Sequence, residues 1–130
     1  MAVMKLNLDH ERFDDYLLVR LEGQWTRDNI QQAIADIAGL AQEQGHNRIL
    51  VDARGLSEPE NDLQRFEAGE HIARMWRGLK VVVIYPEKWI NKFTENTAVN
   101  RGVDMMVVSD YGRAEKWLTD SSARPSITTE

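Results

Sequence analysis

The sequence predicts a single α/β domain built on a mixed sheet of about five strands with about four helices. Apolar and polar residues alternate near the N-terminus, which is typical of half-buried strands. Further along, short apolar runs at 49–51, 79–85 and 105–108 are separated by segments with the spacing of amphipathic helices. This pattern predicts a hairpin followed by parallel strands that right-handed crossovers connect. The length of 130 residues suits one domain.

The first two strands are predicted to pair as a hairpin. Their alternating apolar residues are Met4, Leu6 and Leu8 in the first strand and Leu17, Val19 and Leu21 in the second. The polar segment 11–15 between them indicates the turn, and Gly23 ends the second strand.

Two amphipathic helices follow, with a buried strand between them. In the first helix, Thr26 is the expected N-cap, and Gly45 stands where a left-handed C-terminal residue is expected. The apolar positions of this helix are Ile30, Ala33, Ile34, Ile37, Leu40 and Ala41. The second helix is predicted to follow Asn61 and to end at Gly78, and Gly69 and Gly78 are the places where it is expected to allow movement. Its apolar positions are Leu63, Phe66, Gly69, Ile72, Ala73 and Trp76.

The segment 79–85 is the most apolar of the chain and is expected at the centre of the sheet with both faces covered. Pro86 is expected to start a third helix, because proline is tolerated in a first turn, and Gly102 is expected to end it. The residues on one side of this helix are Trp89, Ile90, Phe93 and Thr97.

The last predicted elements are the strand 105–108 and a short helix that Asp110 caps. The inward residues of this helix are Ala114, Trp117 and Leu118. The domain is therefore expected to cover residues 1–118. Residues 119–130 lack a periodic apolar pattern and are expected to form a flexible tail.

Composition excludes several classes of function. Lys and Arg total 16 against 21 for Asp and Glu, and the net charge of −5 offers no basic surface for non-specific binding to nucleic acid. The absence of cysteine excludes disulfides, thiolate zinc sites and a cysteine nucleophile. The apolar runs are too short for a signal peptide or a membrane span, so the expected location is the cytoplasm, with peripheral contact at the inner face of the membrane as an option.

Several local strings, in their order and spacing, carry a resemblance to a known family. They are Gly23-Gln24-Trp25-Thr26, Val51-Asp52-Ala53-Arg54-Gly55-Leu56, Asn100-Arg101-Gly102 and Ala114-Glu115-Lys116-Trp117-Leu118. Over residues 4–118 the chain resembles the SpoIIAA-like proteins of the STAS/SEC14-like superfamily. The resemblance implies a SpoIIAA-like (STAS-type) fold and a protein that is not an enzyme. STAS domains are protein-interaction modules, of which the antagonists of anti-sigma factors are the best known, whereas SEC14-like relatives hold a lipid between helices and sheet.

In the anti-sigma-factor antagonists, phosphorylation of a serine at the start of the helix after the third strand blocks partner binding. Asn61 and Asp62 occupy the corresponding positions here, so the resemblance implies that the usual switch is missing. Either Asp62 permanently mimics the phosphorylated state, or Asn61 is a helix N-cap and Gln64 completes a capping box. Ser57 is the only hydroxyl in the loop and lies several residues before the expected phosphosite, so we do not expect it to be phosphorylated.

The sequence predicts no catalytic residue, no metal site and no cofactor. Glu58, Glu60 and Asp62 lie near the positive end of the second helix, but they lack the spacing and the glycine of a calcium loop. The chain has three histidines, far apart and without the HExxH spacing of zinc enzymes: His10, His46 and His71. No G-x-S-x-G turn presents a serine, and no glycine-rich phosphate loop is present.

Aromatic residues on the second and third helices form a candidate site for an apolar ligand or for a membrane surface, comprising Phe66, Trp76, Trp89, Ile90 and Phe93. Core packing is the alternative role for the same side chains. The adjacent Trp89 and Ile90 would point about 100° apart on a helix, so one of them is expected near the surface, beside Lys88 and Lys92.

We therefore expect a non-enzymatic binding or regulatory module. Its ligand is expected to be an apolar, lipid-like small molecule, or its target a membrane surface. The alternative is a partner-switching domain of the anti-sigma-factor-antagonist type that lacks the phosphorylatable serine. Exposed apolar helix edges would also allow a homodimer.

Overall fold

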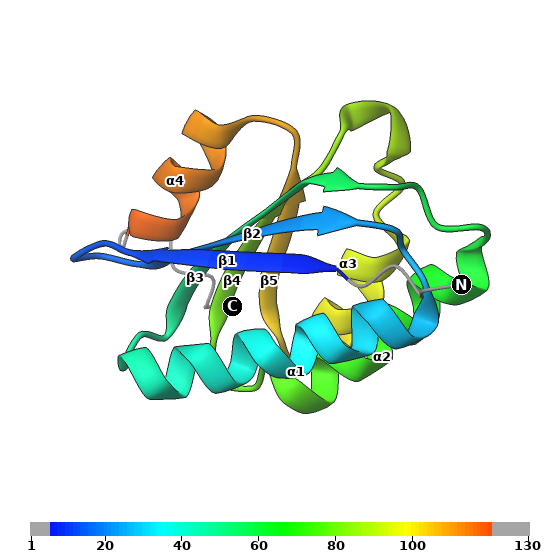
Figure 1. The fold of residues 1–130 in the computed structure, drawn as a ribbon. Helices are drawn as coiled ribbons and strands as arrows, with labels where there is room; N and C mark the ends of the chain where they lie inside the picture. Colours follow the sequence, from blue (N-terminus) through cyan, green and yellow to red (C-terminus); the bar gives the residue numbers. More distant parts are fainter. Residues whose placement is uncertain (1–5, 121–130) are drawn as a thin grey trace.

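The computed structural model describes residues 6–120, and its sheet has five strands in the order β1-β2-β3-β4-β5 (Figure 1). The strands are β1 (Asn7–Arg12), β2 (Leu17–Gly23), β3 (Arg48–Leu56), β4 (Lys80–Ile84) and β5 (Asp104–Val108). β1 pairs antiparallel with β2, and the later pairs are all parallel. The mixed sheet and the order of its elements confirm the prediction from the sequence.

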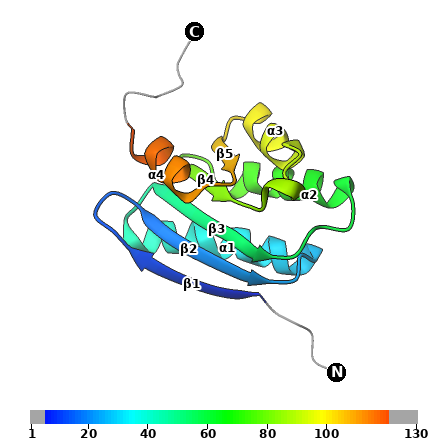
Figure 2. The same cartoon turned by 90° about the horizontal axis from the view of Figure 1, so that it is seen from above.

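The helices divide unequally between the two faces of the sheet. They are α1 (Arg27–Gln44), α2 (Asp62–Met75), α3 (Phe93–Asn100) and α4 (Tyr111–Thr119). The strands add in one direction from β2 to β5, so right-handed crossovers place α1, α2 and α3 on the same face. Figure 1 shows α1 and α2 below the sheet and α4 above it, and Figure 2 shows α2 and α3 on the β5 side of the molecule.

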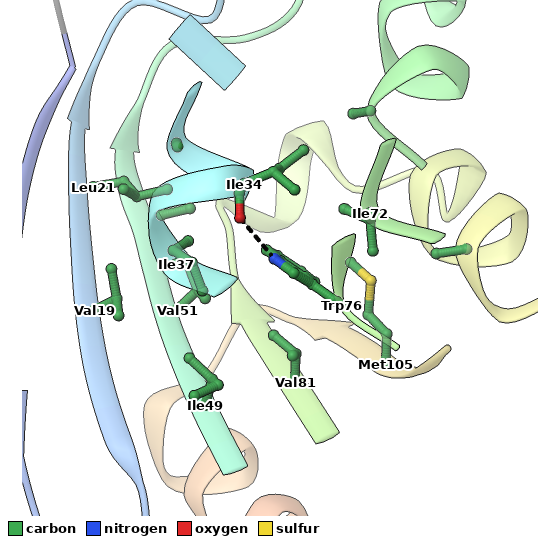
Figure 3. Packing of buried hydrophobic residues seen from close by; sticks show 14 of the residues in the cluster. Val19, Leu21, Ile34, Ile37, Ile49, Val51, Ile72, Trp76, Val81 and Met105 are labelled. Carbon is green, nitrogen blue, oxygen red and sulfur yellow. Dashed lines mark hydrogen bonds between the residues drawn. The ribbon is translucent and has the colours of Figure 1, made fainter. Parts of the chain in front are cut away.

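Alternation along the strands builds a hydrophobic core on each face of the sheet. Under α1 and α2 the core includes Val19, Ile49, Val51 and Val81. On this face Trp76 is 2% exposed and its Nε1–H donates to the backbone oxygen of Ile34 at 3.0 Å, which attaches the end of α2 to α1 (Figure 3). The core beneath α4 is smaller and contains Leu18, Leu50, Val82, Ile84, Val108, Ala114 and Leu118.

Several predictions about where elements begin, end or lie in the sheet are wrong. β1 runs through Arg12, which pairs with Leu17, so the hairpin turn is tighter than the predicted 11–15 and closes with Phe13 N–H donating to Tyr16 O at 2.9 Å. β3, not the apolar β4, is the central strand, although both faces of β4 are covered. α4 extends to Thr119 and Asp120 is its C-cap, so the predicted tail begins within this helix. Residues 121–130 lie outside the described residues, as does Met4 of the first predicted strand.

The third helix starts later than the predicted Pro86. A single 3-10 turn, Glu87–Trp89, follows Pro86, and α3 then begins at Phe93. The break occurs at Lys92, whose φ of 68° is left-handed, and the Asn91 side chain accepts from Phe93 N–H at 3.0 Å. Trp89 and Ile90 therefore do not share a helix with Phe93.

Side chains cover the outer edge of β5 at Val107. Its N–H donates to Glu95 Oε1 at 2.8 Å, and its carbonyl accepts from Lys92 Nζ at 2.8 Å. Lys92 Nζ also lies 3.0 Å from Glu95 Oε1, so the two side chains form an ion pair. Such cover opposes the pairing of an edge strand with another chain.

Gly69 is the point of closest contact between α2 and α3. A Cβ added at Gly69 would lie 2.6 Å from Thr97 Cβ and 2.9 Å from Thr94 O. The sequence suggested Gly69 as a place of movement, whereas the structure packs it against the neighbouring helix.

We expect Gly69→Ala to lower the free energy of unfolding by about 1–3 kcal/mol, because the added methyl group forces α2 and α3 apart. Gly39→Ala is a matched control within α1, where a Cβ meets nothing within 4 Å, and it should stabilise the protein by up to about 1 kcal/mol. Chemical denaturation measures both variants. Equal stability of Gly69→Ala and the wild type would contradict this packing.

Candidate functional site at the C-terminal edge of the sheet

The loops after β2, β3 and β4 meet at one edge of the sheet, because the carboxyl ends of parallel strands lie together. Ser57 connects all three loops. Its N–H donates to Gly23 O at 3.0 Å, its Oγ accepts from Trp25 N–H at 2.8 Å, and its carbonyl accepts from Tyr85 O–H at 2.8 Å. We call this set of three hydrogen bonds the Ser57 junction.

The start of α2 is capped as one of the two sequence interpretations predicts. Asn61 is the N-cap, and its Oδ1 accepts from Gln64 N–H at 3.0 Å. The Gln64 side chain accepts from Glu60 N–H at 2.7 Å rather than from the N–H of Asn61, so the capping box closes one residue earlier than expected.

Asp62, at the other phosphosite-equivalent position, contacts two side chains of the same chain. Its Oδ1 accepts from Asn91 Nδ2 at 3.0 Å and lies 3.6 Å from Arg65 Nε. The carboxylate thereby links the first turn of α2 to the segment that precedes α3.

Three aromatic rings lie at the same edge. The ring centroid of Tyr85 is 6.2 Å from that of Trp25 and 5.7 Å from that of Trp89. Burial raises the pKa of Tyr85 to about 12, and the nearby Arg65 charge offsets part of the rise. The phenol therefore keeps the proton that it donates to Ser57 O.

An apolar cavity of about 90 Å³ lies between α1, α2, the segment 90–95 and the sheet. Its lining includes seven residues labelled in Figure 3: Leu21, Ile34, Ile37, Val51, Ile72, Trp76 and Met105. Pockets for drug-sized ligands occupy roughly 300–1,000 Å³. The cavity therefore has room for a small molecule and not for a whole lipid.

The five residues of the predicted apolar site separate into three groups. Trp76 and Ile90 line the cavity. Trp89 is not part of the lining but packs on Tyr85, which is. Phe66 and Phe93 pack on each other with ring centroids 6.4 Å apart, away from the cavity lining. Trp89 and Ile90 are both half-buried, so this pair does not present the exposed apolar edge that the sequence suggested.

A second surface at this edge consists of Leu63, Phe66 and Phe93, which we call the α2 ridge. Leu63, one of the predicted apolar positions of the second helix, is 58% exposed, and Phe93 is 39% exposed. Leu63 and Phe66 are three positions apart on α2 and so are neighbours on its surface. The exposed acids Glu58, Glu60 and Asp62 lie next to the ridge in sequence.

Sequence reasoning missed Arg65 as a buried residue. Arg65 is 8% exposed and lines the cavity. Gly69 and Ile72 follow it by four and seven positions on the buried face of α2, so helical spacing contained the signal. Its charge suggested a solvent-exposed side chain instead.

Solved structures similar to this one indicate the fold. An anti-sigma factor antagonist from Mycobacterium paratuberculosis has 9% identity and a TM-score of 0.62, with 89% of this chain and 96% of that chain covered. A serine-to-glutamate variant of RsbS from Moorella thermoacetica has 16% identity and a TM-score of 0.57, with 90% of this chain and 98% of that chain covered. An uncharacterised protein from the DUF3478 family with a SpoIIAA-like fold, from Shewanella loihica PV-4, has 17% identity and a TM-score of 0.54, with 91% of this chain and 97% of that chain covered.

The fold is SpoIIAA-like. This confirms the fold that the sequence resemblance implied. No model of a protein family matches the sequence, and no curated protein matches it either.

Residues 6–120 contain no group of three or more His, Cys, Asp or Glu side chains arranged to hold a metal ion. Among the described helices, none has the length and apolar character needed to span a membrane.

We expect Ser57→Ala to lower the free energy of unfolding of this SpoIIAA-like domain by about 1–3 kcal/mol, because Trp25 N–H loses its acceptor in a half-buried place. Ser109→Ala, at an exposed serine, is the control and should change stability by less than about 0.5 kcal/mol. Urea denaturation followed by tryptophan fluorescence measures both. A Ser57→Ala variant as stable as the control would show that the junction does not hold the loops.

We expect the free energy of unfolding to fall as the pH rises from 10 to 12. The phenol of Tyr85 has its ordinary pKa of 10.0 in the unfolded chain and about 12 in the folded chain, so the unfolded state loses the proton first. The stabilisation is complete below pH 10 and disappears through this range. Burial also raises the pKa of Tyr16, so Tyr85→Phe should reduce the slope without abolishing it. Thermal unfolding at several pH values measures the slope, and an unchanged slope in Tyr85→Phe would refute the assignment.

Proposed function

We propose that this protein is a non-enzymatic protein-interaction domain of the anti-sigma-factor-antagonist type, and that the α2 ridge is its docking surface. The observation that carries the proposal is Leu63, which is 58% exposed in the first turn of α2. Exposing a large apolar side chain to water is unfavourable in free energy, and burial against a partner's surface would remove that exposure. The similar folds of an anti-sigma factor antagonist and of an RsbS variant support a protein as the partner.

The charges around the ridge define the complementary surface. Glu58, Glu60 and Asp62 are exposed beside Leu63, and the whole chain carries a net charge of −5. The partner is therefore expected to present an apolar pocket with basic residues at its rim. Charges of this kind speed up association and select the partner more than they add affinity.

Regulation in this proposal does not use a serine at the start of α2. Asn61 caps the helix, and the Asp62 carboxylate is already bonded to Asn91. Asp62 also has one negative charge at most, whereas a phosphoserine has about −1.5 to −2. These residues serve the local structure of α2, so binding is expected to be independent of phosphorylation at this position.

A lipid or membrane function has less support. The cavity of about 90 Å³ is too small for an acyl chain with its headgroup. Lys88 lies over the ring of Trp89 at 4.9 Å, and that ring packs against Tyr85 rather than forming an exposed edge. An apolar ligand for the cavity would have to be much smaller than a lipid.

We expect Leu63→Asp to weaken binding of an anti-sigma factor at least tenfold, because it places a charge where the partner buries an apolar side chain. Isothermal titration calorimetry against each anti-sigma factor encoded in the same genome measures the affinity. The fold should be unaffected, since an acid in the first helical turn is favourable.

Val99→Asp is the matched control for this test. Val99 is 42% exposed and lies six positions after Phe93, on another side of α3. Its substitution should leave the affinity within about twofold of the wild type. Equal binding by Leu63→Asp and the wild type would refute the docking surface, and no binding by any anti-sigma factor would refute the proposed function itself.

A further inference from the structure

β1 forms one outer edge of the sheet, and within residues 6–120 no strand pairs with its outer side (Figure 2). The hairpin closes with Phe13 N–H donating to Tyr16 O, and hydrogen-bonded pairs alternate along an antiparallel ladder. The backbone N–H and C=O groups that point away from β2 therefore belong to Leu8, His10 and Arg12. The opposite edge, at β5, is covered by side chains. The uncovered edge of β1 is open to an added strand.

Two hollows lie between residues 6–10 and α1, directly beside this open edge. One has a volume of about 470 Å³ and the other of about 710 Å³. Leu8 and Asp36 line both hollows, so the two form one continuous surface, which we call the β1–α1 groove. The half-buried side chains of Leu8 and Leu40 give it an apolar floor.

Gly39 is an exposed residue inside α1 and lines the larger hollow. Glycine is less favourable than alanine within a helix. A Cβ added at Gly39 would meet nothing within 4 Å, so no contact within residues 6–120 requires a glycine there. The bare backbone leaves room for the side chain of a partner to lie against α1.

The charges on both sides of β1 are mainly negative. Among the described residues, neither hollow is lined by Lys or Arg, and α1 contributes three carboxylates to the groove: Asp28, Asp36 and Glu43. On the other face of β1, Arg20 lies 3.5 Å from Asp9 and 3.1 Å from Glu11, so one guanidinium faces two carboxylates. A segment rich in lysine or arginine has the complementary charge.

A second copy of β1 complements this edge poorly. The antiparallel register that uses all three outward-pointing residues is centred on His10, and it places Asp9 opposite Glu11 of the second copy. Like charges directly opposite each other on neighbouring strands are destabilising. The edge therefore favours a strand of different sequence over self-association.

We propose that β1 and the β1–α1 groove bind an extended basic segment of another protein, which adds to the sheet as a sixth strand. Side chains alternate between the two faces of a strand. Apolar side chains of the segment contact Leu8 and Leu40 in the groove, and its basic side chains face Asp9 and Glu11. This surface is formed by β1 and α1, so it does not depend on the α2 ridge or on the partner proposed for that ridge.

The test uses the acetylated and amidated heptapeptide Lys-Val-Lys-Val-Lys-Val-Lys as the probe, because it has lysines on one face of a strand and valines on the other. Titration into the whole ¹⁵N-labelled protein at low salt is followed by NMR. We expect a Kd on the order of 0.1 mM. Hydrogen exchange at the amides of Leu8, His10 and Arg12 should slow at least tenfold in the complex, because these groups then donate to the peptide.

Two altered peptides separate charge from strand pairing. The peptide with glutamate in place of every lysine should bind at least tenfold more weakly, because its charge repels the acids along β1 and α1. The peptide with proline in place of the central valine keeps all four lysines but cannot extend a strand. It should also bind at least tenfold more weakly.

Asp36→Lys should weaken binding of the lysine peptide at least tenfold, because it reverses a charge that lines both hollows. Glu87→Lys is the matched control, since Glu87 is an exposed acid outside the groove and its replacement makes the same change in net charge. Its affinity should stay within about twofold of the wild type.

Four results would overturn the proposal. The first is the absence of binding of the lysine peptide by the folded protein. The second is equal binding of the proline peptide, which would show charge attraction without an added strand. The third is equal binding by Asp36→Lys and the wild type. The fourth is a dimer of the free protein in which the amides of Leu8, His10 and Arg12 are already protected, which would show that a second copy occupies the edge.

Discussion

The Ser57 junction is the constraint on which the C-terminal edge of the sheet depends. One residue uses its amide, its hydroxyl and its carbonyl to hold the loops after β2, β3 and β4. Parallel strands bring these loops to one edge, but only a specific set of bonds determines where the loop after β3 turns into α2. The same bonds place Tyr85 between Trp25 and Trp89, and they position the first turn of α2 over the cavity.

Because its start is fixed, α2 can serve two surfaces at once. Leu63 is exposed and Phe66 is half-buried on the α2 ridge, whereas Arg65, Gly69 and Ile72 are buried on the side of α2 that faces the interior. Gly69 brings α3 close, and the interior side of α2 closes the cavity. A protein partner on the ridge would therefore contact the first turn of α2 from outside, while other residues of the same helix close the cavity.

Much of the fold follows from patterns within single elements. The N-cap at Asn61 was predictable because a cap depends on residues within one turn. Pro86 was wrongly predicted to start the third helix. The tolerance of proline in a first turn says nothing about Lys92, whose left-handed backbone lies immediately before the first residue of α3, Phe93. The exposure of Leu63 was not predicted from the sequence. The spacing of apolar residues gives the direction of a side chain on a helix, but not how far a neighbouring element extends along that helix.

The candidate site was less predictable than the fold, because its parts come from separate loops. Nothing local to Ser57 indicates that Gly23, Trp25 and Tyr85 all reach it. Hydrogen exchange at the amides of Trp25 and Ser57 in the wild-type protein tests the junction most directly. We predict that both amides are protected and open together, with the same free energy. Free exchange of either amide while those of β3 stay protected would contradict it.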